Sequence, residues 1–249
     1  LIGVFASAPR VWATDLDVAF DAGVRRFGAA RAVAVQADGK VVVGGIFSFT
    51  DGMVSAGNLA RFNADGSLDT AFRTATGTGA NGPIYALTVH TDGKIYLAGN
   101  FTSFNGTPRN RVARLNSDGT LDDTFDPGTG PNGVVIAMAV QSDGKPVIGG
   151  QFTSVASTVR NRVARLNTNG THDTTFANIT SNNGANGTVW DLTLDSSGRA
   201  VIVGEFTSVH GTTRNRIARL TTSGALDTTI AFTGGTNGAI FTVEVDSAG

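Results

Sequence analysis

The sequence repeats with a period of 51 to 54 residues, and this repeat constrains the fold more than any other feature. A turn glycine recurs once per period, at Gly39, Gly93, Gly144, Gly198 and Gly249. A phenylalanine stands eight residues after each of the first four, at Phe47, Phe101, Phe152 and Phe206. Repeats of about this length are typical of solenoids, propellers and other arrays, in which each unit buries its apolar surface against its neighbours. The chain is therefore expected to fold as a series of stacked units.

Each unit shows the short alternating segments of β-strands. In the first unit these are AVAVQ at 32–36, a Val- and Ile-rich run at 40–47, the ARF segment that begins at Ala60, and the short LDTAF at 68–72. Four short strands per unit are the usual content of a propeller blade. Both faces of the first two strands are apolar or small, so each sheet needs a neighbour on either side. The sequence predicts an all-β fold, a β-propeller built from four-stranded antiparallel blades.

The repeat also predicts the domain organisation. Complete blades are expected at 29–72, 83–125, 134–176 and 188–230, with partial blades at 14–28 and 239–249, all within one repeat domain at 14–249. Residues 1–13 are apolar and carry Val11 and Ala13 at the −3 and −1 positions of a cleavage site, as in the tail of a secretory signal peptide; an ordinary first strand is the alternative. Because the repeat stops inside a unit, the chain is expected to be a fragment of a longer one.

The turns predict one ion pair in each blade. Asn63-Ala64-Asp65-Gly66 fits a type I turn whose glycine is left-handed and closes as a bulge. That turn places Arg61 opposite Asp69, whereas a two-residue turn would send the two side chains to opposite faces. By repetition we expect four structural pairs: Arg61–Asp69, Arg114–Asp122, Arg165–Asp173 and Arg219–Asp227.

Charge and composition exclude several classes of function. The 19 Lys and Arg residues against 20 Asp and Glu give a net charge of −1, so no strong field attracts nucleic acid or an anionic membrane. No run approaches the roughly 20 apolar residues of a membrane span. Without cysteine, the chain has no disulfide and no thiolate ligand or nucleophile. His90, His172 and His210 fall at different positions of the repeat, so no metal site and no cofactor are expected.

Two further motifs admit a structural explanation. The segments 77–82 and 128–133 fit GxGxxG, but no βαβ unit surrounds them, so they are expected to connect blades. The pattern Asn63-x-Asp65-Gly66-x-x-Asp69 has the alternating oxygens of a calcium loop. Later copies lose these carboxylates, which favours the hairpin over a calcium site.

The repeated segments resemble a known family. DGKVVVGGIF and NGTPRNRVARLNSDGTLDDTF, with their copies over 15–249, are similar to the delta-sixty repeat, a β-propeller family of bacterial surface and secreted proteins. The resemblance implies a propeller and an extracellular setting, and it brings no catalytic residues. Some copies depart from the pattern: Ser197-Gly198-Arg199 replaces DGK, Thr221-Thr222-Ser223-Gly224 replaces NxDG, and Leu59 is interpreted as replacing the arginine of NR.

Positions that differ from blade to blade are the candidates for function. One first-strand position reads Arg31, Tyr85, Ile136, Trp190 and Phe241. In the fourth blade, Asp191 follows this position, and Glu205 on the second strand is expected to share its face. Trp190, Asp191 and Glu205 could together hold a sugar or a cation, or the two carboxylates could act as an acid and base pair. The alternative is that all three are solvated rim residues.

The leading hypothesis is a secreted or cell-surface binding or adhesion module with no catalysis of its own. The loops at 48–58, 102–110, 153–161 and 207–215 are expected to gather at one face and contact a protein or glycan partner. The alternative is a carbohydrate-active propeller enzyme or lectin that uses carboxylates near the central channel. Glutamate occurs only at Glu205 and Glu244, which favours the binding module.

Overall fold

A computed structural model describes residues 26–50, 55–177, 183–230, 232 and 235–246. The expected signal remnant at 1–13 lies outside the described residues, as does the partial blade at 14–28 up to residue 25. Most of the chain forms four consecutive antiparallel sheets of three strands each, here called blades 1 to 4. Blade 1 contains β1 (Arg26–Val35), β2 (Val41–Thr50) and β3 (Ser55–Phe62), and blade 2 contains β4 (Ile84–Val89), β5 (Ile95–Gly99) and β8 (Val112–Leu115). Blade 3 contains β9 (Val135–Val140), β10 (Pro146–Gly150) and β13 (Val163–Arg165), and blade 4 contains β14 (Val189–Leu194), β15 (Ala200–Gly204) and β18 (Ile217–Leu220).

The turns within each blade have the predicted geometry. Between β1 and β2, the Gly39 N–H donates to the Gln36 carbonyl at 2.9 Å, and the Gln36 N–H donates to Lys40 at 2.8 Å. Gly39 has a φ of +82°, which an L side chain rarely adopts. In the next turn of blade 1 the Gly66 N–H donates to the Asn63 carbonyl and the Asn63 N–H donates to the Ser67 carbonyl, and Gly66 has a φ of +84°. These are type I turns closed by a glycine bulge, and they set the register of each hairpin.

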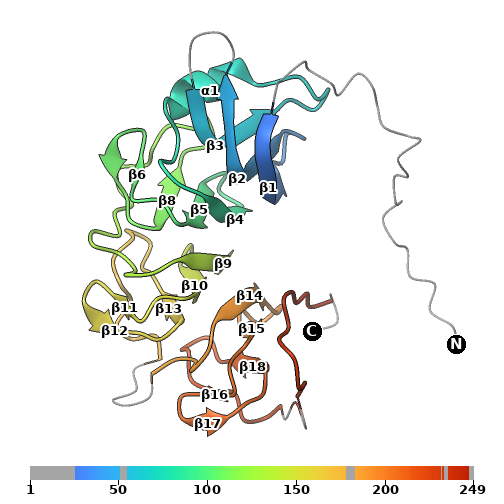
Figure 1. Ribbon diagram of the computed structural model, residues 1–249, viewed down its shortest axis with the longest axis vertical. Helices are drawn as coiled ribbons and strands as arrows, with labels where there is room; N and C mark the ends of the chain where they lie inside the picture. The colour runs from blue at the N-terminus through green and yellow to red at the C-terminus, as the bar shows by residue number, and fades with distance from the viewer. Residues whose placement is uncertain (1–25, 51–54, 178–182, 231, 233–234, 247–249) are drawn as a thin grey trace, which may run out of the picture.

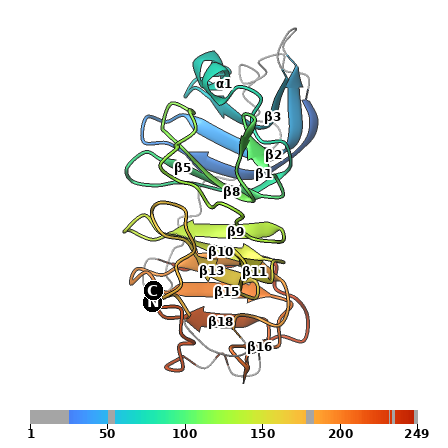
Figure 2. The same cartoon turned by 90° about the vertical axis from the view of Figure 1, so that its left-hand side faces the viewer.

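The blades are arranged as a fan, with the first strand of each blade on the inner side (Figure 1). Figure 2 shows the same sheets stacked one above another. Neighbouring inner strands contact each other, β1 with β4, β4 with β9 and β9 with β14. The chain therefore forms the radial array of a β-propeller.

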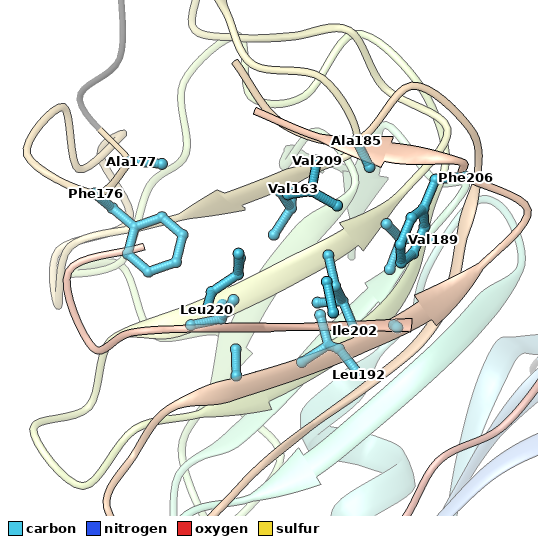
Figure 3. Packing of buried hydrophobic residues seen from close by; sticks show 14 residues of the cluster. Val163, Phe176, Ala177, Ala185, Val189, Leu192, Ile202, Phe206, Val209 and Leu220 are labelled. Atoms are coloured by element: carbon cyan, nitrogen blue, oxygen red, sulfur yellow. The ribbon is translucent and has the colours of Figure 1, made fainter. Parts of the chain in front are cut away.

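The core lies between the blades. Three of the four apolar clusters each join two adjacent blades, and Figure 3 shows the one in which Val163 of blade 3 lies near Val189 and Ile202 of blade 4. Glycine lets the sheets approach closely, since a Cβ at Gly44 would lie 2.6 Å from Ile84 of the next blade. At the position that packs on the preceding blade, Leu87, Met138 and Leu192 are 5 to 9% exposed, whereas Val33 of blade 1 is 59% exposed. A blade thus depends on its neighbour for burial.

The fourth segment of each unit departs from the expected four-stranded blade. Leu68, Leu121, His172 and Leu226 each make only an isolated antiparallel bridge to the third strand or to the residue after it. The aspartate that follows each bridge turns the chain away. In blade 2, Asp122 Oδ1 accepts hydrogen bonds from the N–H and the hydroxyl of Thr124, which is an Asx turn. In blade 1, Asp69 instead caps the helix α1 (Thr70–Thr76), an element that the strand pattern did not predict.

The loops between the second and third strands form hairpins in blades 2 to 4. These are β6 (Ser103–Phe104) with β7 (Thr107–Pro108), β11 (Ser154–Val155) with β12 (Thr158–Val159), and β16 (Ser208–Val209) with β17 (Thr212–Thr213). The hairpins lie along the outer, convex side of the fan (Figure 1). In blade 1, residues 51–54 of this loop lie outside the described residues.

Two details of the expected alignment were wrong. Leu59 pairs with Gly44 as Val112 pairs with the equivalent Ala98, so Leu59 does not replace the arginine of NR. Asn58 does, and it adopts a φ of +66° where Arg111 has +65°. Residues 240–245, expected as the first strand of a further blade, form no strand but lie against blade 4, where the Ile240 N–H donates to Gly204.

The described part of the chain contains one helix, α1, and at seven residues it is too short to span a membrane.

Candidate functional site

The four predicted arginine and aspartate pairs are the most regular polar feature of the structure. Arginine Nε and aspartate Oδ2 are 3.0 Å apart in blade 1, 2.8 Å in blade 2, and 2.9 Å in blades 3 and 4. In blades 1 to 3 both partners are buried, with no more than 8% of either residue exposed. These pairs are therefore buried ion pairs, not the exposed cross-strand pairs that contribute only a few tenths of a kcal/mol.

Each buried arginine also holds the next blade. Arg114 Nη1 donates to the carbonyl of Thr168 in blade 3 at 2.7 Å, and Arg165 Nη1 donates to Thr222 in blade 4 at 2.6 Å. Arg61 makes the same contact with Ser117 of blade 2. The guanidinium of Arg114 also lies over the ring of Phe125, 4.9 Å from its centroid. Arginine, aspartate, phenylalanine and the neighbouring carbonyl form a unit that we call the junction.

The junction carboxylates stay ionised. Burial by itself would raise the pKa of Asp69, but hydrogen bonds from Lys40, the Phe72 N–H and Arg61 lower it to about 2. Burial would likewise raise the pKa of Asp122, but hydrogen bonds from Thr124 and Lys94 and the charge of Arg114 hold it well below its ordinary value. A carboxylate held in this way cannot act as a general acid near neutral pH, and its oxygens already accept hydrogen bonds from the fold, in keeping with a structural role.

Both carboxylate oxygens of the candidate residue Asp191 accept hydrogen bonds from within the protein. Its Oδ1 accepts the Leu192 N–H at 2.8 Å, and its Oδ2 accepts the Thr242 hydroxyl at 3.0 Å and the Val243 N–H at 2.9 Å. Asp191 therefore ties the segment at 240–245 to blade 4. Glu205 is exposed and does not line the hollow that Asp191 faces. The structure does not bring the two carboxylates to one cavity, which argues against an acid and base pair.

Trp190 and Asp191 instead border a hollow on the inner side of the fan, of about 580 Å³. Its lining consists of Arg31, Tyr85, Val134, Ile136, Gln151, Trp190, Asp191 and Phe241. Five of these eight residues are the whole set of the first-strand position that changes in every unit. Trp190 and Phe241 lie side by side, with ring centroids 5.9 Å apart and planes tilted by 45°. The contact that Asp191 makes with Thr242 and Val243 places Phe241 at this hollow.

The hollow has the chemistry of a binding site. Three aromatic rings provide flat apolar faces, while Arg31 and Gln151 provide an exposed guanidinium and an exposed amide. No group of three His, Cys, Asp or Glu side chains within the described ranges could hold a metal ion. The sequence singled out the variable position that contains Arg31, Tyr85 and Phe241, but it grouped only Trp190, Asp191 and Glu205 as a site. What the sequence did not show is that the variable residues of different units meet in one hollow.

A second hollow, of about 470 Å³, lies beside the hairpin of blade 4. It is lined by Asn161, Arg162, Gly184, Ala185, Asn186, Ser208 and Gly211. Its polar groups already serve the fold: Asn186 Oδ1 accepts the N–H groups of Thr207 and Ser208, and Arg162 donates to the Ala185 carbonyl. It therefore offers fewer free groups for recognition than the inner hollow does.

The stacked blades and the inner hollow define a β-propeller repeat domain. A family model matches residues 36–72, 90–125, 141–176 and 195–229, more than half of the chain. The chain belongs to this family, which is described as a domain of unknown function (DUF5122) beta-propeller. No curated protein matches the chain in sequence.

Several solved structures resemble the chain at low sequence identity. One is a catalytically inactive variant of virginiamycin B lyase from Staphylococcus aureus with quinupristin, with 16% identity, a TM-score of 0.43 and coverage of 82% of this chain and 58% of that one. Another is the WD40 beta propeller domain of Doa1, with 14% identity, a TM-score of 0.45 and coverage of 78% and 66%. The chain spans less than two thirds of either structure.

Proposed function

We propose that this chain is an extracellular binding module, without catalysis of its own, that holds a partner in the inner hollow. The observation that carries the proposal is that the first-strand position that changes in every unit converges on one hollow. Repeat proteins commonly bind through side chains that vary on a constant scaffold. The partner is a protein or a glycan, since aromatic rings beside polar groups can recognise either.

The absence of catalysis in this proposal is supported by the state of the carboxylates. Asp191 accepts three hydrogen bonds from the fold, and the junction aspartates are paired with arginine. The extracellular setting is supported by the sequence alone, through the signal-like residues 1–13 and the likeness to the delta-sixty repeat. Protection of the full-length protein from protease added to intact cells would contradict that setting.

The test is a binding screen with the whole chain, immobilised on a sensor and exposed to arrays of glycans and peptides. Trp190→Ala and Tyr85→Ala should each weaken the strongest interaction by at least about tenfold, because aromatic anchors carry most of the energy of such sites. Val159→Ala is the matched control, since Val159 is 63% exposed on a hairpin away from the hollow. Equal binding by all three variants would overturn the proposal.

A further inference from the structure

We infer that the inner hollow recognises the acidic, carboxylate-bearing end of a glycan, with Arg31 binding the carboxylate and the aromatic rings packing against the sugar. This inference rests on the proposed function and names the class of ligand. It follows from the charges that the structure leaves available in the hollow.

The charged side chain that the fold leaves free in the hollow is Arg31, whereas the carboxylate of Asp191 is engaged. The Arg31 side chain is exposed, and its guanidinium makes no hydrogen bond or ion pair with any described residue. Asp191 is the only carboxylate of the lining, and its two oxygens are occupied by Leu192, Thr242 and Val243. A free guanidinium is suited to a carboxylate, because its parallel N–H groups bind both oxygens. The sequence had allowed a sugar, a cation or an acid and base pair at this place, and the hydrogen bonds of Asp191 favour the sugar over the cation.

The apolar part of the hollow is suited to a sugar ring. Trp190 and Phe241 present adjacent faces, and Tyr85 lies on the neighbouring first strand of the same lining. The electron-rich face of an aromatic ring attracts the polarised C–H groups on the flat side of a pyranose. Gln151, exposed beside the rings, offers both a donor and an acceptor to the sugar hydroxyls.

The openness of the site favours the end of a polymer over a free small molecule. Phe241 is 67% exposed, and Arg31 and Gln151 are also exposed. Sites for small molecules usually bury about 70 to 90% of the ligand surface, which an open hollow of this kind does not do. A terminal sugar can bind here while the rest of its chain extends into solvent.

The experiment uses trigalacturonic acid and its fully methyl-esterified form, which keeps the rings and removes the charge. Calorimetry on the whole chain should show at least about tenfold tighter binding of the acid. Arg31→Ala should abolish this preference, and Trp190→Ala should weaken binding of both sugars. Arg214→Ala is the control, because Arg214 directly follows β17 of blade 4 and lies outside the lining, so its loss should leave the preference unchanged.

The outcomes separate this inference from the proposed function. Equal binding of both sugars, lost in Trp190→Ala and retained in Arg31→Ala, would overturn the acidic class and leave the binding site in place. The same holds if neither sugar binds but a peptide or a neutral glycan does so through Trp190. Binding that no substitution in the hollow changes, or no binding to any array, would overturn both.

Discussion

The two ends of the innermost strands differ in a way that separates assembly from recognition. At the end of β9 where the chain turns into β10, Gln141 accepts from Arg165 and donates to Gly198 of the next blade. At the opposite end of the same strand, Ile136 faces the inner hollow. At the turn end the arginine and aspartate pair recurs in all four blades, while the hollow end shows a different residue each time. Contacts that join like units must repeat, whereas contacts with a single external partner need not.

The largest expected effect is at the junction. Arg114→Ala leaves Asp122 buried without its arginine and removes the bond to Thr168, so it should lower the free energy of unfolding by about 3 to 5 kcal/mol. Urea denaturation checks this value. Lys145→Ala is the control, because the exposed pair of Lys145 with Asp143 should contribute less than about 1 kcal/mol. Similar losses in the two variants would mean that the junction does not hold the blades together.

Acid should lower the stability that the arginine and aspartate pairs provide. Asp69 and Asp227 have pKa values of about 2 in the folded chain, below the 3.8 of an ordinary aspartate. Because the unfolded chain takes up protons first, the stability that these groups provide is complete above about pH 5 and is lost as the pH falls toward 2. Urea titrations between pH 2 and 7 measure the loss, which should be smaller in Asp69→Asn. A stability that is flat down to pH 3 would contradict the low pKa values.

The chain has two tyrosines, and the same substitution in each compares the junction with the hollow. Tyr96 is buried, its hydroxyl donating to Gly144 at 3.0 Å and accepting from Arg114 at 3.3 Å. Tyr96→Phe should therefore lower the free energy of unfolding by about 1 to 2 kcal/mol. Tyr85→Phe, in the half-exposed hollow, should change it by less than about 0.5 kcal/mol. Urea denaturation of both variants measures the two changes in the free energy of unfolding, and equal changes would contradict the prediction.

The smallest expected effect is an increase in stability, on replacement of His172. His172 occupies the position that is leucine in the other three blades, and both of its ring nitrogens are buried without a hydrogen-bond partner among the residues that the structure describes. Burial and the nearby charge of Arg160 lower the pKa of His172, so stability is lost as the pH falls below about 6.5. His172→Leu should raise the free energy of unfolding by about 1 kcal/mol and flatten its dependence on pH between 5 and 7. Thermal denaturation across that range measures both effects.

His210 provides the contrast for this last prediction. Its Nδ1 accepts the Gly184 N–H at 3.0 Å, and its Nε2 lies 3.0 Å from the Gly224 carbonyl. His210→Leu should therefore destabilise the chain, because it removes both partners from buried main-chain groups. Stabilisation by both substitutions would show that hydrogen bonding does not distinguish the two histidines.

The repeat made much of the fold predictable. The turn glycines, the register that pairs Arg61 with Asp69, and the stacking of sheets all follow from local patterns that recur four times. The LDTAF segment and its copies were predicted incorrectly as strands, because the hydrogen bonds that the aspartate accepts from the residues after it outweighed the apolar alternation. The short hairpins between the second and third strands of blades 2 to 4 were not predicted, since strands of two residues are too short to show an alternation of apolar and polar residues.

The candidate site was predictable only in part. Trp190 was recognised as unusual for its position, and the structure places it in the lining of the hollow. The role of Asp191 could not be read from the sequence, because its partners Thr242 and Val243 lie about fifty residues away. A sequence shows that a carboxylate is present but not which hydrogen-bond donors already engage its oxygens.

Because the arginine of blades 1 to 3 donates to a carbonyl of the following blade, an inner unit such as blade 2 or 3 carries both a donor for the next blade and an acceptor for the preceding one. Copying one unit into the gene would insert a blade whose donor and acceptor already match those on either side. Such an array can grow or shrink by whole units while its seams stay chemically the same. Force applied to the two chain ends should correspondingly detach the blades one at a time, beginning with a terminal blade, instead of separating all of them at once.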